Sequence, residues 1–386
     1  MMTRFEFAAP HRIIFGSGTL QEAIPAALQF GKRAILVTGS NPTRCKPLAS
    51  LLTDAGFHVA IFSVSGEPVI TTIEAGVETA LREKADLVIS FGGGSALDAG
   101  KAIAAMLTNP GSLHDHLEVI GRGLPFQHAP APFIAIPTTA GTGSEATRNA
   151  VLASPSHGVK VSLRHPLMLP KVAIVDPDLL RGTPPNIAAS TGLDAITQLL
   201  EPFVCSRTNP IVDALCRDGL IRAGRSIRAV CSDLPTDAAR EDMALASLFG
   251  GMALANAGLG AVHGFAGPIG GMFPAPHGAV CAALLPHATR INLRALQQRH
   301  PGHPSINLYA QSYAFLSGIR PATPELLPEW LVNLVTQLHI PGLATHGVKE
   351  EHFPVLIQNA RQASSMKANP VPLTDAELGE ILKISL

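Results

Sequence analysis

The sequence predicts an α/β domain over residues 1–182, followed by an all-α domain over residues 183–386. Three observations support this division. In the first half, short unbroken apolar runs alternate with amphipathic stretches. After residue 176 these runs nearly vanish, and leucine- and alanine-rich periodic stretches take over. Between the halves lies Arg181-Gly-Thr-Pro-Pro185, whose glycine and prolines are typical of a domain boundary.

The apolar runs of the first half are expected to form a parallel, doubly wound sheet. Runs that are unbroken rather than alternating are typical of strands buried on both faces. The intervening stretches, residues 47–55 and 71–84, have the spacing of amphipathic helices. The expected strands cover residues 33–38, 58–63, 86–91 and 132–137, and a further extended segment covers residues 172–176.

Helical periodicity dominates the second half. It occurs in residues 194–200, 209–229, 237–254 and 328–338. An uncharged segment, residues 249–276, resembles a membrane span in composition, but it contains Asn256, His263, Pro268 and several glycines. We therefore expect a buried helix that breaks into a loop, with its histidine as a candidate lining of a site.

Charge and cysteine content narrow the class of protein. Among 386 residues, 29 Lys and Arg balance 29 Asp and Glu, so we expect neither nucleic acid nor a membrane as a partner, but a small molecule. The N-terminal segment has charged residues and no apolar run of signal-peptide length, which predicts a cytoplasmic protein. Five cysteines without a CxxC pair are interpreted as reduced packing residues: Cys45, Cys205, Cys216, Cys231 and Cys281.

A glycine-rich turn follows the strand expected at residues 86–91. It reads Ser90-Phe-Gly-Gly-Gly-Ser-Ala-Leu-Asp-Ala-Gly-Lys101, and a helix is expected to begin near Ser95. Glycines let the backbone approach a phosphate, and a helix N-terminus favours its charge. The segment matches neither GxGxxG nor a Walker A sequence. The segment can therefore be a pyrophosphate-binding turn or a tight strand-to-helix connection without a ligand. Asp98 and Lys101, three residues apart, can be an ordinary surface ion pair.

A second polar loop, Pro137-Thr-Thr-Ala-Gly-Thr-Gly-Ser-Glu145, also follows a strand directly. Four hydroxyl side chains and two glycines in nine residues can hydrogen-bond phosphate, ribose and amide groups. By itself, the same composition also suits a polar turn without a ligand.

Four side chains of the second half can form a metal site. Asp194 and Gln198 are four residues apart, which places both on one face of a helix. His263 and His277 lie beside glycine and proline further along the chain. A carboxylate, an amide and two imidazoles can hold a divalent metal with one position open for substrate. The alternative is that both histidines are hydrogen-bonded structural residues.

Taken together, these motifs resemble the iron-containing (group III) alcohol dehydrogenase family over nearly the whole chain. Beyond the two loops, Gly192-Leu-Asp-Ala195 and the histidine pair, the resemblance includes Lys160–Arg164, Val175–Asp178 and Asn369-Pro370. It implies a dinucleotide-binding domain over residues 1–182 and a metal-binding domain over residues 183–386. It also implies the dehydroquinate synthase-like fold, an active site in the cleft between the domains, and a homodimer or larger homo-oligomer.

The resemblance assigns roles residue by residue. The residues that correspond to the nicotinamide-nucleotide site are Gly39, Ser40, Asn41, Gly93, Gly94, Ser95, Asp98, Thr138, Thr139, Thr142, Thr147, Val151 and Lys160. Those that correspond to the metal ligands, and act in catalysis through the metal, are Asp194, His263 and His277, with Gln198 at the fourth position. The implied metal is iron, with zinc as the alternative.

Two departures from the family pattern affect the expected chemistry. Gln198 stands where the family has histidine, and its amide oxygen is a poorer ligand than imidazole for a transition metal. Gly267 replaces the second histidine of a His-Gly-x-x-His motif, an imidazole suspected of relaying protons in the family. Gln198 can therefore coordinate weakly, leave a three-ligand site, or leave none.

The expected function is that of a metal-dependent NAD(P)-linked alcohol dehydrogenase, or a reductase of aldehydes or keto acids. The alternatives are a maleylacetate-reductase-like enzyme, a dehydroquinate-synthase-like lyase, and a degenerate nucleotide-binding protein without metal. The lyase needs several basic residues for a phosphate-bearing substrate, and residues 249–276 contain none.

The cofactor is expected to be NAD or NADP. In nucleotide folds, an acidic residue after the second-ribose strand repels a 2′-phosphate. Many family members carry Asp at the place of Gly39, but no carboxylate occurs here from Gln29 to Thr53.

Overall fold

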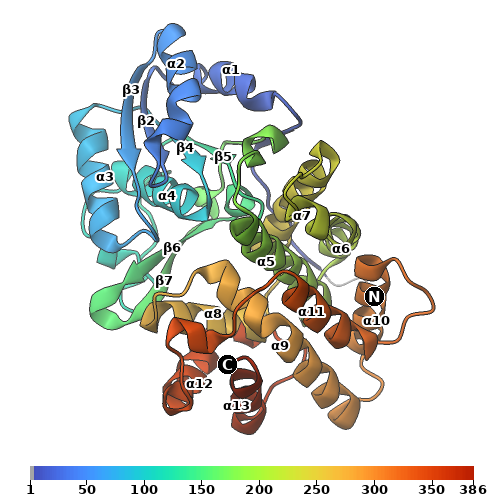
Figure 1. Cartoon of the computed structure of the whole chain (residues 1–386). Helices are drawn as coiled ribbons and strands as arrows, with labels where there is room; N and C mark the ends of the chain where they lie inside the picture. The colour runs from blue at the N-terminus through green and yellow to red at the C-terminus, as the bar shows by residue number, and fades with distance from the viewer. Residues whose placement is uncertain (1–3) are drawn as a thin grey trace. The chain divides into compact units, whose positions relative to one another are not determined.

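The computed structural model describes residues 4–386, which form two compact units. The sheet unit comprises residues 9–139 and 143–181. The helical unit comprises residues 4–8, 140–142 and 182–386. In Figure 1 the sheet unit runs from blue to green, and most of the helical unit runs from green to red.

The sheet unit contains a six-stranded parallel sheet with the strand order β1-β8-β5-β4-β2-β3. Its strands are β1 (Arg12–Phe15), β2 (Arg33–Thr38), β3 (His58–Ser63), β4 (Leu87–Gly92), β5 (Phe133–Pro137) and β8 (Val172–Val175). The five strands expected from apolar runs are confirmed. β1 was not expected, because it has only four residues and begins with a charged one.

Helices cover both faces of this sheet, as unbroken apolar strands require (Figure 1). Along β2, Ile35 and Val37 join one core with α3 (Ile70–Arg82) and α4 (Gly94–Thr108). Leu36 points the other way and joins a second core with α1 (Ala23–Ala27) and α2 (Lys46–Asp54). The alternation follows from the two-residue period of a strand.

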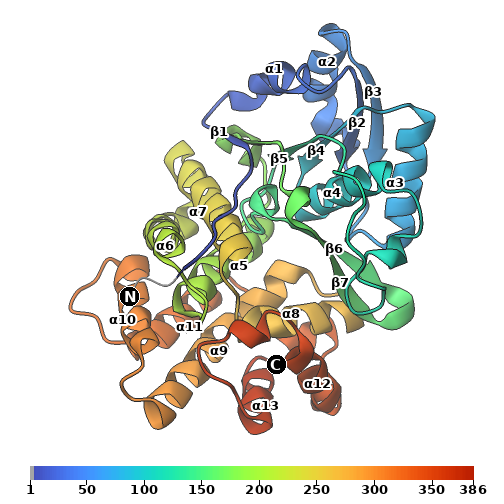
Figure 2. The ribbon, with the colours of Figure 1, turned by 180° about the vertical axis from the view of Figure 1, so that it is seen from behind.

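An antiparallel hairpin of β6 (Asn149–Ser154) and β7 (Val159–Arg164) extends the sheet unit (Figure 2). Ala150, Leu152 and Val161 lie in the same core as α4, whereas Val151, between the first two, is exposed. The sequence analysis did not expect this hairpin, because one polar face and one short apolar face give a weak signal.

The order of the strands reverses between β2 and β4. From β2 the chain moves outward to β3 on one side, and from β4 it moves through β5 to β8 on the other. In open α/β sheets, ligands bind outside the carboxyl ends of the strands at such a switch point. The turns after β2, β4 and β5 are therefore the places in this unit to examine for a nucleotide.

The helical unit consists of nine α-helices in its described residues. They are α5 (Pro185–Val204), α6 (Pro210–Val230), α7 (Asp237–Asn256), α8 (Ala261–Met272), α9 (His277–Arg299), α10 (Pro304–Ser317), α11 (Leu326–Gln337), α12 (Phe353–Gln362) and α13 (Asp375–Ile384). The four stretches with helical periodicity correspond to α5, α6, α7 and α11 and overrun them by at most one residue, so these expectations are confirmed. Asn209 caps α6 and Thr236 caps α7, each by accepting a backbone N–H.

The uncharged segment breaks as expected. α7 ends at Asn256, and α8 begins at Ala261 after a bend of 95°. Among residues 4–386, no single helix is both long and apolar enough to cross a membrane, and only this bent pair reaches that length and composition. The histidine of the segment, His263, lies in the first turn of α8, where it is almost fully buried.

Candidate metal centre and nucleotide-binding turns

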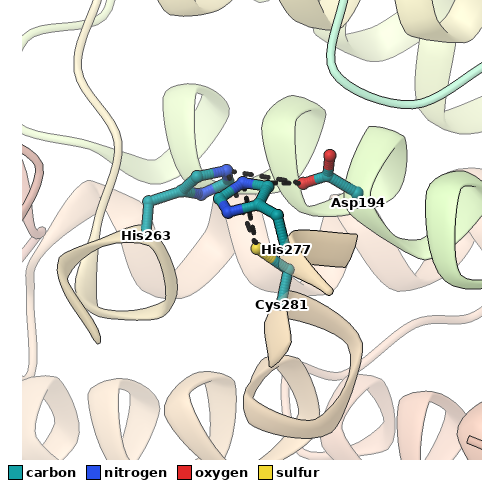
Figure 3. A group of neighbouring side chains, drawn as sticks. All are labelled: Asp194, His263, His277 and Cys281. Carbon is teal, nitrogen blue, oxygen red and sulfur yellow. Dashed lines mark hydrogen bonds and ion pairs between the residues drawn. The ribbon is translucent and has the colours of Figure 1, made fainter. Parts of the chain in front are cut away.

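Four side chains of the helical unit turn ligand atoms toward one another (Figure 3). They are Asp194, His263, His277 and Cys281, and one ligand atom of each lies within 4.8 Å of the others. Asp194 Oδ1 is 3.5 Å from His263 Nε2 and 3.8 Å from His277 Nε2. The structure thus brings together three of the four predicted ligands and adds a thiol that the sequence analysis interpreted as packing.

Close packing of α9 against α5 brings His277 to Asp194. Gly278, at the start of α9, faces the backbone of α5, and a Cβ there would lie 2.7 Å from the carbonyl oxygen of Ser190. Only glycine permits this approach without a shift of backbone. Cys281 follows His277 by four residues, so both side chains lie on the same face of α9.

His263 is oriented by a carboxylate that the sequence analysis did not assign. Its Nδ1 donates to Glu201 Oε2 at 2.7 Å, while the other oxygen of Glu201 accepts the N–H of Val262 at 2.8 Å. With Nδ1 carrying the proton, the Nε2 lone pair faces Asp194, which is the usual arrangement behind a metal-binding imidazole. The signal for Glu201 was its spacing, seven residues after Asp194 on the same face of α5.

A residue from near the C-terminal end of the described chain fixes the start of α8. Asn369 Oδ1 accepts the N–H of Ala261 at 3.0 Å and the side-chain N–H of Asn292 at 3.1 Å. The Asn369 amide in turn donates to Asn292 Oδ1 and to the carbonyl of Val371. The helix that carries His263 therefore begins on a fully bonded polar group.

Two buried acceptors at this site have no hydrogen-bond partner within residues 4–386: Asp194 Oδ1 and Gln198 Oε1. Gln198 donates through Nε2 to the carbonyl of Gly141 at 3.2 Å, which directs its oxygen away from that bond. An unsatisfied buried acceptor costs about 1–3 kcal/mol, so a cation is the natural partner. The donor set of carboxylate, imidazoles and thiol fits a divalent transition metal.

Asp194 carries the charge that such a site needs. Burial alone would raise the pKa of its carboxyl, but the facing imidazoles of His277 and His263, when they are protonated, more than offset this, so the pKa of Asp194 is lowered. The carboxylate is therefore ionised, which is the form that binds metals.

In the sheet unit, three predicted segments meet at the switch point. Thr38 at the end of β2 pairs with Phe91, and Gly92 at the end of β4 pairs with Pro137 of β5. A Cβ at Gly92 would lie 3.4 Å from the backbone nitrogen of Gly39. The turn after β2 and the turn after β4 are thus in contact, as a nucleotide site at this place requires.

The glycine-rich turn leads directly into α4. Gly93 is the N-cap, no side chain of the described residues caps the helix, and Gly94 and Ser95 form its first positions. A Cβ at Gly93 would lie 3.2 Å from Thr139 Oγ1, so the two loops are neighbours. Backbone N–H groups at an uncapped helix start, beside a hydroxyl, suit a phosphate.

Behind this turn, Lys101 and Asp98 form a buried network instead of a surface pair. Lys101 is 1% exposed, and its Nζ donates to the Ser144 carbonyl at 3.0 Å, to Thr147 Oγ1 at 2.8 Å and to the carbonyl of Asn149. Asp98 pairs with Nζ at 3.2 Å. The surface-pair alternative is therefore wrong, because three-residue spacing does not reveal which helix face is buried.

Asp98 also ties the polar loop to the hairpin. Its oxygens accept from Ser144 Oγ at 2.5 Å and from the N–H of Val151 at 3.0 Å. Three residues assigned to the cofactor by resemblance, Asp98, Thr147 and Val151, thus take part in one protein network. Contact of these residues with a nucleotide stays a prediction.

The remaining predicted cofactor residues occupy different surroundings. Asn41 caps a short 3₁₀-helix after β2 by accepting the N–H of Thr43 at 3.1 Å, and Ser40 precedes it. The N–H of Thr138 donates to the Gly92 carbonyl at 2.9 Å. Lys160 donates to Glu67 Oε1 at 2.7 Å. Thr142 belongs to the segment of the helical unit at residues 140–142.

Glu145 should make the stability of the protein depend on pH. It is 2% exposed, and burial raises the pKa of its carboxyl from 4.5 to about 7, although a backbone hydrogen bond and Lys101 oppose this. Because the folded pKa is raised, the stabilisation is complete below pH 4.5 and is lost as the pH rises through about 7. We expect Glu145→Gln to remove this pH-dependent loss of unfolding free energy, which amounts to about 3 kcal/mol at most.

Urea unfolding at pH 5 and pH 8 measures this dependence. The difference in unfolding free energy between Glu145→Gln and the unmodified protein should grow at the higher pH. Glu74→Gln, on the exposed face of α3, serves as the control and should not change the dependence. A difference that is equal at both pH values would contradict the expectation.

Comparison with known proteins agrees with this geometry. The sequence model of the family described as iron-containing alcohol dehydrogenase matches residues 10–177. The sequence model of the C-terminal region of the Fe-containing alcohol dehydrogenase family matches residues 188–386. The chain is similar to alcohol dehydrogenase 4 of Schizosaccharomyces pombe, with 32% identity over 386 residues that cover 98% of this chain and 89% of the relative.

Two further relatives cover both chains almost completely. The NAD-dependent methanol dehydrogenase of Bacillus methanolicus is 31% identical over 386 residues, or 98% of this chain and 99% of the relative. A crystal structure of 1,3-propanediol oxidoreductase is 32% identical, covers 100% of both chains and has a TM-score of 0.89. The chain therefore belongs to the iron-containing alcohol dehydrogenase family and is a metal-dependent, NAD-linked alcohol dehydrogenase.

Proposed function

We propose that this enzyme interconverts a small alcohol and its carbonyl compound at a metal held by Asp194, His263 and His277. The observation that carries this is the unsatisfied Asp194 Oδ1, which lies 3.5 Å and 3.8 Å from two imidazole nitrogens. A bound divalent metal polarises the alcohol or carbonyl oxygen as a Lewis acid. The protein orients the ligands, and Glu201 holds His263 in the tautomer that exposes Nε2.

The nicotinamide nucleotide is proposed to bind at the switch point of the sheet. The backbone N–H groups at Gly93, Gly94 and Ser95 would face its pyrophosphate, as the uncapped start of α4 supports. Thr138, Thr139 and Thr142 supply hydroxyl groups for its other polar atoms. Hydride transfer then needs only that the two bound reactants are held in line, with no covalent nucleophile.

The substrate class is proposed to be small alcohols, with keto acids as the second candidate. Gly267 lies four residues after His263 on α8, and apart from its chain neighbours and its own helix backbone no described atom lies within 4 Å of a Cβ built there. Without an imidazole at this position, the enzyme has room beside His263 for a substituent of the substrate. Keto acids are proposed as the second class because Gly267 stands where the family's His-Gly-x-x-His motif has its second histidine.

Metal analysis combined with a cofactor assay tests the proposed function. We expect about one divalent ion per chain and steady formation of reduced cofactor with an alcohol, and its reversal with an aldehyde or a keto acid. Cofactor turnover without net reduction would support a lyase instead. Protein that binds nucleotide but neither retains metal nor oxidises an alcohol would support a degenerate binding protein.

Both NADPH and NADH are proposed to serve as cofactors, and Gly39→Asp tests this. Apart from its two chain neighbours, no described atom lies within 4 Å of a Cβ at Gly39, so aspartate fits there without strain. Its charge would repel a 2′-phosphate, so kcat/KM with NADPH should fall by about tenfold or more, or roughly 1.4 kcal/mol, while NADH use stays or improves.

A matched control exists for this substitution. Gly302, between α9 and α10, also has no described atom within 4 Å of a built Cβ, and Gly302→Asp should change neither cofactor's kcat/KM. Equal effects of Gly39→Asp on both cofactors would mean that this turn does not contact the second ribose.

We further propose a cytoplasmic location and a homodimer or larger homo-oligomer. All five cysteines are unpaired, which supports a reducing compartment. The proposed oligomer rests on the resemblance to the family, and light scattering of the purified protein measures its mass directly.

A further inference from the structure

We propose that Cys281 is the fourth protein ligand of the metal, in a chain whose Gln198 stands where the family pattern has a histidine ligand, and that the resulting site prefers zinc to iron. This inference rests on the proposed metal site of Asp194, His263 and His277. It changes the identity of the resident ion and leaves the proposed reaction in place, because substrate oxygen would enter as a fifth ligand, an expansion that catalytic zinc sites allow.

Four of the six distances between the donor atoms are close to those of a tetrahedral site, and the other two are at most 4.8 Å. With metal–ligand distances of about 2.1 Å for nitrogen and oxygen and about 2.3 Å for sulfur, tetrahedral donors lie about 3.4–3.6 Å apart. Cys281 Sγ is 3.6 Å from His277 Nε2 and 4.0 Å from His263 Nε2. Asp194 Oδ1 is 3.5 Å and 3.8 Å from the same two nitrogens. All four distances come within about half an ångström of the tetrahedral values.

The position of Cys281 differs from that of a packing residue. It is fully buried, and its sulfur lies within 4.8 Å of ligand atoms of two imidazoles and a carboxylate (Figure 3). In the described chain, none of the other four cysteines joins a group of candidate metal ligands. Cys216 is equally buried on α6 and provides the contrast.

Charge favours the thiol over the amide. A divalent ion held by Asp194, two neutral imidazoles and the neutral amide of Gln198 leaves one positive charge buried, which is costly. A thiolate at Cys281 brings the sum to zero. Gln198 Oε1 has no hydrogen-bond partner among the described residues, but as a neutral oxygen it would bring no charge to the ion.

The same exchange changes the metal preference. Thiolate is a soft ligand that selects zinc, and zinc stands above iron(II) in the general order of affinities. On binding, the ion replaces the thiol proton, which passes to the buffer. No oxidation state changes in this step.

Cobalt(II) provides a direct test, because a thiolate–cobalt bond gives a charge-transfer absorption in the near ultraviolet. Protein stripped by a chelator is loaded with cobalt(II) under anaerobic conditions. The band should appear, persist in Cys216→Ser and Gln198→Ala, and vanish in Cys281→Ser. Bound cobalt without the band, or a band that survives Cys281→Ser, would overturn the proposal.

Metal competition provides the second measurement. With equal zinc(II) and iron(II), anaerobic protein should retain mainly zinc, and Cys281→Ser should lower the zinc-to-iron ratio by about tenfold or more, since the loss of even an outer partner of a ligand costs 10–100-fold. If Cys281→Ser does not fold, a chain with serine at the other four cysteines leaves Cys281 as the sole thiol, and the band must persist there.

The two proposals fail in different ways. Metal-dependent alcohol oxidation without a thiolate band would overturn the role of Cys281 and leave the proposed function intact. Protein that binds no metal and oxidises no alcohol would overturn both.

Discussion

Replacing Asp194 with alanine should abolish metal retention and turnover while nucleotide binding persists. Asp194 is 1% exposed and lies within reach of both imidazole nitrogens. A Lewis acid contributes several kcal/mol to the lowering of the barrier, so kcat/KM should fall by about a thousandfold or more. His277→Ala should have the same effect, because it removes a second ligand.

Elemental analysis, turnover and a nucleotide titration together measure this effect. Asp218→Ala is the control, since Asp218 is a half-exposed acid on α6 of the same unit. It should leave all three measurements unchanged. Loss of nucleotide binding in a folded Asp194→Ala protein would contradict separate metal and nucleotide sites, and full metal retention would place the ion elsewhere.

Replacing Lys101 with methionine should destabilise the sheet unit and weaken nucleotide binding. One buried ammonium donates to three oxygens of the polar loop and the start of β6, and pairs with Asp98. Methionine keeps the length of the side chain but leaves Asp98 and these acceptors without their donor. Breaking a buried pair in this way costs about 3–5 kcal/mol.

Urea unfolding and nucleotide titration test this expectation. The urea concentration at the midpoint of unfolding should fall. The slope m, which gives the dependence of the unfolding free energy on urea concentration, should change little, because nearly the same surface is exposed on unfolding. Lys46→Met, at the exposed start of α2, should change the unfolding free energy by less than about 0.5 kcal/mol. If Lys101→Met lowers the unfolding free energy by less than about 1 kcal/mol, the buried network stabilises the protein no more than a surface ion pair does, which would contradict the expectation.

The sequence could predict the sheet because its central strands are unbroken apolar runs. Ile35, Leu36 and Val37 are all fully buried, on alternating faces, so composition alone identifies the strand. β1 and the hairpin of β6 and β7 could not be predicted in this way. Their residues are stabilised by partners far along the chain, and local hydropathy carries little trace of such partners.

The candidate site shows the same limit. Asp194, His263 and His277 were found through the order of motifs, and the structure brings their ligand atoms together. Cys281 and Glu201 were missed, although their spacing from His277 and Asp194 places them on the same helix faces. A cysteine in an apolar helix usually packs, and only the fold reveals which neighbours its sulfur meets.

The hydrogen bond from Asn369 to the start of α8 affects the stage of protein synthesis at which the enzyme can bind its metal ion. Ala261 is held by Asn369, 108 residues further along the chain. At about 5–20 residues per second, a ribosome needs roughly 5–20 s to make that stretch. The first N–H of α8 therefore lacks its acceptor while the nascent chain grows from Ala261 to Asn369. Cellular metal carriers should consequently meet an assembled site only after translation has passed residue 369.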